Sequence, residues 1–211
     1  MMTANLKKSI AHLRRDPILR RIMDKLPPPD HTWDRVRRNH FRSLVIAIVN
    51  QQLSGKAAAT ILKRFVALFP GGRFPKPDDV LKMPAPKMRV AGLSKMKVSF
   101  LKDLARHVIR GSVDFKKMSR MTDEEVIEHL TRVKGIGRWS AEMFLMFSLG
   151  RPDVFSHGDL GLRNAIRDLY GFVKHPTARQ AEKISAVWRP YRTLASRYLW
   201  ASVDLKNPAK E

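Results

Sequence analysis

The chain of 211 residues contains no cysteine. This absence excludes disulfide scaffolds, thiol nucleophiles, zinc fingers and iron–sulfur clusters held by cysteine ligands. Long apolar runs are missing too, because no stretch approaches the roughly eighteen uninterrupted apolar residues of a membrane-spanning helix. The first residues also lack the apolar run and the cleavage site of a secretory signal. We therefore expect a protein that works inside the cell and does not use a membrane.

Acidic residues are few. Lysine and arginine together number 41, against 19 aspartates and glutamates, which leaves a formal net charge of +22. The excess is uneven, because residues 1–110 carry a net +17 and residues 111–211 a net +5. With 44% hydrophobic residues the chain is too apolar to be a disordered basic tail. Such a charge is most simply explained by a polyanionic partner, nucleic acid first and an anionic membrane surface second.

The hydrophobic pattern predicts an all-α fold, since no pair of segments alternates with the period of two that a β-hairpin requires. We expect eight to ten helices in a two-lobed bundle with a central cleft, and a single compact unit over residues 1–211. Capping residues mark three helix starts, at Asp16, at Ser94 and at Thr122. The predicted helices cover residues 17–26, 41–49, 54–69, 94–111, 122–132, 138–149, 160–170, 177–187 and 190–203. Residues 70–86 are predicted as a loop with at most a turn or two of helix, and 150–158 as a second loop.

The most informative segment is TRVKGIGRWSA, residues 131–141, between two predicted helices. Two glycines around one apolar residue predict a tight turn in which Ile136 plugs between the helices. The backbone N–H groups around Gly135 and Gly137 would face outward at the start of the next helix, where they can bind a phosphate without reading base sequence. A Gly-x-Gly pair alone is often only a turn, but its place between two helices in a basic chain strengthens the interpretation.

Residues 133–141 resemble the hairpin of the helix-hairpin-helix DNA glycosylase superfamily, which would make the whole motif about 122–149. That superfamily carries a catalytic aspartate downstream of the motif, and Asp159 occupies that place. Three further segments resemble its alkylation-repair branch, the 3-methyladenine DNA glycosylase II type. They are NQQLSGKAA at 50–58, GLSKMK at 92–97 and WRPYRTLASRYLW at 188–200.

The resemblance implies a monofunctional DNA glycosylase in base excision repair. Such an enzyme flips alkylated purines, of the 3-methyladenine and 7-methylguanine type, out of duplex DNA and hydrolyses the N-glycosidic bond. Double-stranded DNA with damaged bases is the expected partner, and we expect a monomer. The expected location is the cytoplasm and nucleoid of a prokaryote or the nucleus of a eukaryote.

Asp159 has two compatible interpretations. An aspartate directly before a helical pattern is most often an N-cap. A helix N-terminus also favours an ionised carboxylate, which can stabilise positive charge on a sugar or orient and deprotonate an attacking water. The resemblance selects Asp159 as the catalytic carboxylate.

Further roles follow from the resemblance alone. Trp139 and Trp200 match base-pocket aromatics, although ordinary core residues are the alternative. Gln52 matches the wedge that fills the gap left by a flipped nucleotide, although it could simply be a polar helix end. The candidate DNA contacts are Gly135, Gly137, Lys134, Arg138, Lys97 and Arg192, although any one basic residue is more often just a solvated side chain.

Cofactor expectations are also set by the resemblance. Bifunctional relatives carry a lysine two residues after the second glycine, for a Schiff base with the sugar. Trp139 stands there, so no lyase activity is expected. The family implies a sodium or potassium ion held by hairpin carbonyls, those of Thr131, Val133 and Ile136. No cofactor is required, and an iron–sulfur cluster is excluded.

Two rival functions remain open at this point. A non-enzymatic helix-hairpin-helix DNA-binding protein would share the charge and the glycine turn, but would use Asp159 only as a cap. A glycosylase for deaminated or oxidised bases would share the chemistry and differ in its pocket. Release of free bases from methylated DNA would distinguish the expected enzyme from the first rival. Base release from a panel of lesions would distinguish it from the second.

Overall fold

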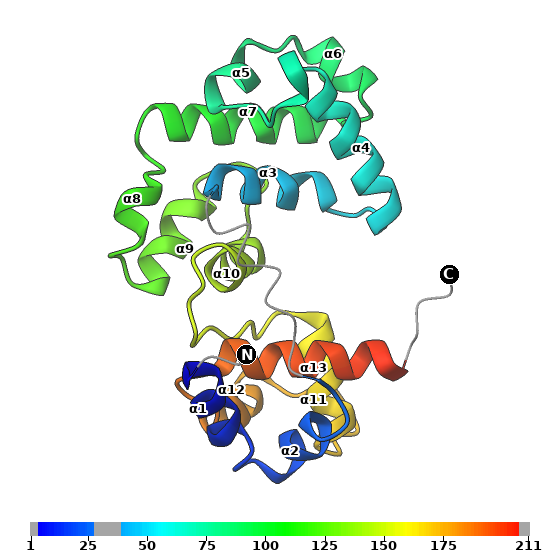
Figure 1. Cartoon of the computed structure of the whole chain (residues 1–211), viewed down its shortest axis with the longest axis vertical. Coiled ribbons are helices and arrows are strands. Elements are labelled where there is room, and N and C mark those ends of the chain that lie inside the picture. The colour runs from blue at the N-terminus through cyan, green and yellow to red at the C-terminus, as the bar shows by residue number, and fades with distance from the viewer. Residues whose placement is uncertain (1–3, 28–38, 207–211) are drawn as a thin grey trace. The chain divides into compact units, whose positions relative to one another are not determined.

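The computed structural model describes residues 4–27 and 39–206, and within these ranges it contains helices and no strand (Figure 1). The prediction of an all-α fold is therefore confirmed. The α-helices are α1 Ala4–Leu13, α2 Pro17–Met23, α3 His40–Asn50, α4 Gly55–Ala67, α5 Pro77–Lys82, α6 Ala85–Val90, α7 Lys95–Ile109, α8 Phe115–Met118, α9 Asp123–Thr131, α10 Arg138–Phe147, α11 Leu160–Leu169, α12 Ala178–Ala186 and α13 Arg192–Lys206, with a short 3₁₀ turn η2 at Pro70–Gly72.

The predicted capping residues begin their helices. The Asp16 side chain accepts from two amides of α2, and Ser94 accepts from the Lys97 amide at the start of α7. Thr122 and Glu125 form the capping box of α9. Each of these side chains pairs backbone N–H groups that have no partner inside the helix, which explains why the sequence located these starts well.

The predicted count of eight to ten helices was too low, because the described ranges hold thirteen α-helices. The prediction omitted α1 and two short helices, α6 and α8. Helix α6 follows Pro84 and has Pro86 in its first turn, where a proline costs no hydrogen bond. These prolines made residues 70–86 resemble a loop. The predicted helix at 17–26 ends earlier, at Met23.

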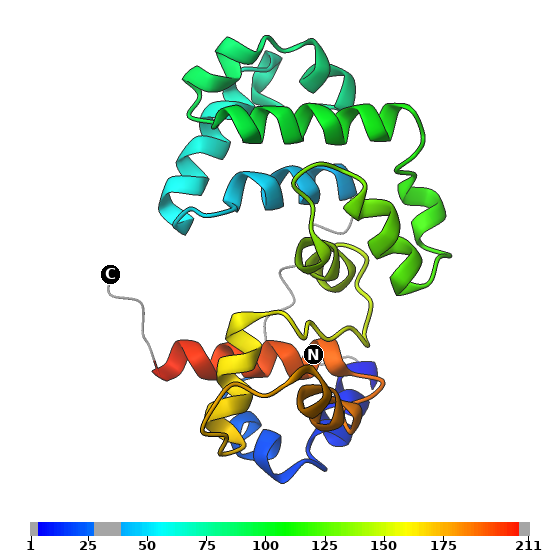
Figure 2. The same ribbon diagram turned by 180° about the vertical axis from the view of Figure 1, so that it is seen from behind.

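The chain divides into two compact units. We call Trp33–Leu149 the central unit, and Met1–Thr32 with Gly150–Glu211 the terminal unit. In the central unit, α7 packs against α5, α6 and α3, while α9 packs against α10 (Figure 2). The prediction of one compact unit over the whole chain stays a prediction.

The terminal unit has its own hydrophobic core, in which α13 packs against α11 and α2. Trp188 and Tyr198 are fully buried there. The indole N–H of Trp188 donates to Asp16 Oδ2 at 2.8 Å, and Tyr170 donates to the same oxygen. Trp188 is therefore a core residue.

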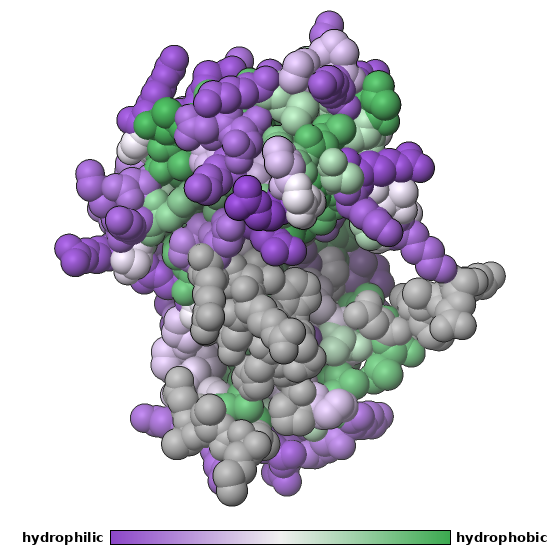
Figure 3. Space-filling view, turned by 45° about the horizontal axis from the view of Figure 1, so that its top comes forward, coloured by the Kyte–Doolittle hydropathy of each residue, from purple (hydrophilic) through white to green (hydrophobic). Residues whose placement is uncertain are grey.

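Hydrophilic side chains cover much of the face seen in Figure 3, with apolar residues scattered among them. Among the helices of residues 4–27 and 39–206, none combines the length and apolar character that crossing a bilayer requires.

Candidate active site

Asp159 is the N-cap of α11, and only 7% of it is exposed. Its Oδ1 accepts a hydrogen bond from the Leu162 amide at 2.8 Å and another from the indole N–H of Trp200, also at 2.8 Å. One donor belongs to the helix that begins here and the other to α13. The carboxylate is thus held in one orientation by two elements of the terminal unit, in a place where the helix N-terminus favours an anion.

Gly161 makes room for this arrangement. A Cβ built at this position would lie 2.9 Å from Cδ1 of Trp200 and 3.1 Å from Oδ1 of Asp159. Any side chain at residue 161 would therefore push the indole away from the carboxylate. The sequence reasoning assigned no role to this glycine, although a glycine inside the first turn of a helix is a signal of close approach.

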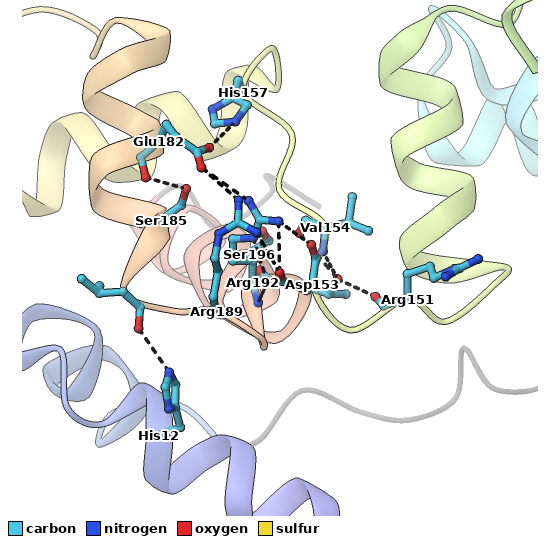
Figure 4. A network of polar contacts seen from close by, with 12 residues as sticks. His12, Arg151, Asp153, Val154, His157, Glu182, Ser185, Arg189, Arg192 and Ser196 are labelled. Atoms are coloured by element: carbon cyan, nitrogen blue, oxygen red, sulfur yellow. Dashed lines mark hydrogen bonds and ion pairs between the residues drawn. The ribbon is translucent and has the colours of Figure 1, made fainter. Parts of the chain in front are cut away.

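The loop that leads to Asp159 is held by ion pairs, which Figure 4 shows. Asp153 Oδ1 lies 2.7 Å from Nε of Arg192, and Asp153 Oδ2 lies 3.3 Å from NH1 of Arg189. Glu182 on α12 joins the same network, with 3.1 Å to Arg189 and 2.9 Å to Nε2 of His157. Burial opposes its ionisation, but the hydrogen bond from Arg189 and the nearby positive charges lower the pKa of Glu182.

Arg192 was predicted to contact phosphate, and its surroundings do not favour that role. Only 12% of its side chain is exposed, and its guanidinium makes hydrogen bonds to both carboxylate oxygens and the carbonyl of Asp153. The N–H donors of Arg192 that bind Asp153 in this way stabilise the loop. We therefore leave Arg192 out of the proposed DNA contacts.

The hairpin of the central unit contains the predicted glycine turn, and the outward orientation of its N–H groups stays a prediction. Ile136, in the segment that joins α9 to α10, is buried, and Gly137 is the N-cap of α10. Gly135 has a φ of +81°, and a Cβ there would lie 2.2 Å from the Phe100 ring of α7. Only glycine fits this position, for both steric and conformational reasons.

The hairpin is anchored to α7 by Asp103. Oδ2 of this buried carboxylate accepts from the Lys134 amide at 2.9 Å, and Oδ1 pairs with Arg106 at 3.0 Å. Burial by itself raises the pKa of Asp103, but the hydrogen bonds from Lys134 and Arg106 and the charge of His107 outweigh it and lower the pKa. The Lys134 amide is therefore used within the protein, while its side chain is exposed.

Two other predicted phosphate contacts are also engaged with protein groups. Arg138 pairs with Glu124 and, at 3.1 Å, with Glu142, and the hydrogen bond that Arg138 donates to Glu124 raises the pKa of Arg138. Lys97 donates from Nζ to the Val49 carbonyl at 2.7 Å, and burial lowers its pKa. The Arg138 side chain is still 58% exposed, whereas Lys97, near the start of α7, is half-buried.

The predicted wedge lies in an unusual backbone conformation. Gln52 follows α3 with a φ of +55°, and among the described residues it is the one non-glycine residue with a positive φ. Its side chain is exposed. The preceding Gln51 donates from Nε2 to the Gly135 carbonyl at 2.7 Å, across 84 positions of sequence. Left-handed non-glycine residues cluster at ligand-contacting sites, which agrees with the predicted role of Gln52.

The two predicted pocket tryptophans lie in different units. Trp139, in the first turn of α10, is 49% exposed, so it is not an ordinary core residue. Trp200 packs in part against the terminal core and turns its N–H to Asp159. The structure therefore brings Trp200 and Asp159 together, and Trp139 stays a predicted pocket residue.

The predicted hairpin cation stays a prediction. Of the three carbonyls named for it, that of Val133 accepts the Ile136 amide at 3.1 Å, which leaves it one further lone pair. Carbonyl oxygens suit a hard monovalent cation. Over the ranges that the structure describes, no cluster of three or more histidine and carboxylate side chains is placed to hold a metal.

Known proteins resemble this chain in sequence and structure. The family model described as "HhH-GPD superfamily base excision DNA repair protein" matches residues 45–190. DNA-3-methyladenine glycosylase 1 of Schizosaccharomyces pombe is 39% identical over 175 residues, which cover 82% of this chain and 77% of that protein.

Comparison with solved structures finds similar proteins of the same kind. The structure of the S. pombe 3-methyladenine DNA glycosylase in complex with abasic DNA matches with a TM-score of 0.82 and 36% identity, over 93% of this chain and 97% of that one. A DNA-3-methyladenine glycosidase from Bacillus halodurans matches with a TM-score of 0.78 and 34% identity, over 95% and 91% of the two chains. The chain therefore belongs to the HhH-GPD superfamily of base excision DNA repair proteins.

Proposed function

We propose that this protein is a monofunctional DNA glycosylase that removes alkylated purines, of the 3-methyladenine and 7-methylguanine type, from duplex DNA. The observation that carries the proposal is the buried carboxylate of Asp159, held at the start of α11 by the Leu162 amide and the Trp200 indole. The names of the similar proteins support the same substrate class.

The chemistry needs one fixed anion. Cleavage breaks the bond between C1′ and the base nitrogen, and positive charge develops on the sugar. Asp159 stabilises this charge and accepts a proton from the water that adds to C1′, so that the products are a free base and an abasic site. The abasic DNA bound in the S. pombe structure is a product of this kind.

A second acid is unnecessary for the proposed substrates. Alkylation at N3 or N7 makes the purine cationic, so that the electron pair of the breaking bond neutralises the leaving base. An aromatic face also attracts a cationic base, by about 0.5–2 kcal/mol more than a neutral one. We assign this role to Trp139, which is 49% exposed. Trp200 combines a pocket position with a hydrogen bond to Asp159.

DNA is bound by the central unit in this proposal. The glycine turn at Gly135 and Gly137 presents backbone amides to a phosphate, with the exposed Lys134 beside it. Gln52 inserts into the duplex and fills the space of the flipped nucleotide. Trp139 takes the position that a Schiff-base lysine would need, so the strand is left uncut. The enzyme works inside the cell, where its DNA substrate is, and as a monomer.

Free base is the product to measure. The purified protein is incubated with methylated duplex DNA, released bases are separated by chromatography, and the strand is examined with and without alkali. We expect free 3-methyladenine, and strand breaks only after alkali. DNA binding with no released base would overturn the proposal in favour of a binding protein. Duplexes that carry deaminated or oxidised bases are tested in parallel, and release from these duplexes but not from methylated DNA would place the enzyme in another lesion class.

A further inference from the structure

Gln51 connects two elements that the proposed function uses separately, namely the wedge turn after α3 and the phosphate-binding hairpin before α10. Its side-chain amide donates to the Gly135 carbonyl at 2.7 Å. The next residue is Gln52, in the left-handed conformation. The residue directly before the wedge is therefore hydrogen-bonded through its side chain to the hairpin.

The peptide that receives this hydrogen bond is held at both ends. The carbonyl of Gly135 accepts from Gln51, and the N–H of the same peptide, that of Ile136, donates to Val133 at 3.1 Å. Hydrogen bonds in such a chain polarise one another. The orientation of the hairpin peptide and the position of the Gln51 side chain are therefore set together.

Helix α7 supports both elements from one face. Lys97 donates to the Val49 carbonyl near the end of α3, and Asp103 accepts from the Lys134 amide of the hairpin. Between them, the Phe100 ring covers Gly135. These three residues recur at a spacing of three, which places them along one side of the helix. The wedge turn and the hairpin are thus attached to the same rigid element as well as to each other.

We propose that Gln51 is a positioning residue that couples binding of phosphate at the hairpin to insertion of the Gln52 wedge, an inference that rests on the proposed function. With the hydrogen bond in place, a hairpin seated on the DNA backbone holds the wedge turn in its strained, insertion-ready conformation. Without it, Gln52 relaxes to ordinary backbone angles, since a left-handed conformation is unfavourable for a non-glycine residue. Gln51 then acts through Gln52 and does not itself contact the base.

The test separates binding from insertion. A duplex carries a stable abasic-site analogue with 2-aminopurine opposite the gap, and the Gln51→Leu variant is compared with the wild-type protein. Fluorescence anisotropy reports binding, and 2-aminopurine emission reports insertion. We expect an insertion equilibrium reduced about 3- to 10-fold, which is the effect of one hydrogen bond, with a dissociation constant within about threefold of wild type. With methylated DNA, we expect kcat to fall and KM to stay nearly constant.

Gln180→Leu is the matched control, because it removes an equivalent amide from the capping box of α12 in the terminal unit. It should leave insertion unchanged. Gln51→His, which keeps an N–H donor, should recover part of the insertion signal. Equal losses of binding and insertion in Gln51→Leu, or an unchanged insertion signal, would overturn the coupling. Because the assay uses no base release, absence of catalysis in the wild-type protein would count against the proposed function alone.

Discussion

The hairpin and the aspartate site use charge in different ways. Around the hairpin, cations predicted for DNA are mostly paired with protein groups: Arg138 with two glutamates, and Lys97 with a helix carbonyl. At the aspartate site, two of the groups that hold the Asp159 carboxylate are neutral N–H donors. The large positive surplus of the sequence therefore says little about which residues touch DNA.

This difference suggests a division of work between the units. Backbone amides and a glycine turn can bind a phosphate on any sequence, so in the proposed function the central unit supplies most of the DNA binding. The terminal unit orients the carboxylate of Asp159, which in the proposed function carries out the chemistry. Substitutions in the first region should change affinity or insertion, and substitutions in the second should change the rate of base release.

The largest effect on the hairpin should come from Gly135→Ala. The added methyl group meets the Phe100 ring at a positive φ, so we expect a loss of about 2–5 kcal/mol in the free energy of unfolding. DNA affinity should fall with it. Urea denaturation measures the stability change. Gly55→Ala is the control, because a Cβ there meets nothing within 4 Å. Equal stability of the two variants would contradict the close approach of α7.

Trp200→Phe should slow base release about 10- to 100-fold, since it removes a hydrogen bond to a charged group worth about 1.5–3 kcal/mol. The aromatic face is kept, so DNA affinity should change little. Single-turnover kinetics on methylated DNA measure the rate. Trp188→Phe removes an indole N–H from Asp16 instead and should lower stability only. A normal rate in Trp200→Phe would show that Trp200 acts only as an aromatic surface.

The hairpin anchor should be sensitive to acid. The pKa of Asp103 is lower in the folded than in the unfolded chain, so its ionisation stabilises the fold at neutral pH. This contribution is lost as the pH falls from the unfolded value of about 4 through the folded pKa. Asp103→Asn should cost about 1–3 kcal/mol at pH 7, and less as the pH falls below 4. A difference that is constant with pH would show that the charge has no part in the anchor.

The smallest effect should come from Lys134→Met. Removing one exposed cation from beside the DNA backbone should lower affinity several-fold on every sequence and reduce the salt slope of binding by about 1. Titrations at several salt concentrations measure this slope. Arg192→Met should leave the slope unchanged and lower stability, because that guanidinium binds Asp153. A reduced slope in Arg192→Met would restore it as a DNA contact.

Local signals in the sequence predicted much of the fold. Capping side chains located the starts of α2, α7, α9 and α11, because they satisfy amides within a few residues of themselves. The same reasoning missed α6, where Pro84 and Pro86 resemble loop residues until the helix they begin is seen. The Gly-x-Gly turn was predicted correctly because its conformation depends on the glycines themselves.

The sequence could not predict contacts between residues that are far apart along the chain. The need for glycine at 161 depends on an indole 39 positions away, and the hydrogen bond of Gln51 to Gly135 spans 84 positions. The pairing of Arg192 with Asp153 likewise follows from packing that no local pattern reveals. The sequence placed Asp159 at a helix start, but the Trp200 N–H that orients its carboxylate comes from another helix.

The most direct test of the central claim is base release by Asp159→Asn, measured with its affinity for the same methylated duplex. We predict that release of 3-methyladenine falls by at least about 100-fold while the dissociation constant stays near that of wild type. Asp153→Asn is the control, because it removes a carboxylate from the loop network and should weaken stability more than chemistry. Release by Asp159→Asn at a rate close to wild type would contradict the account.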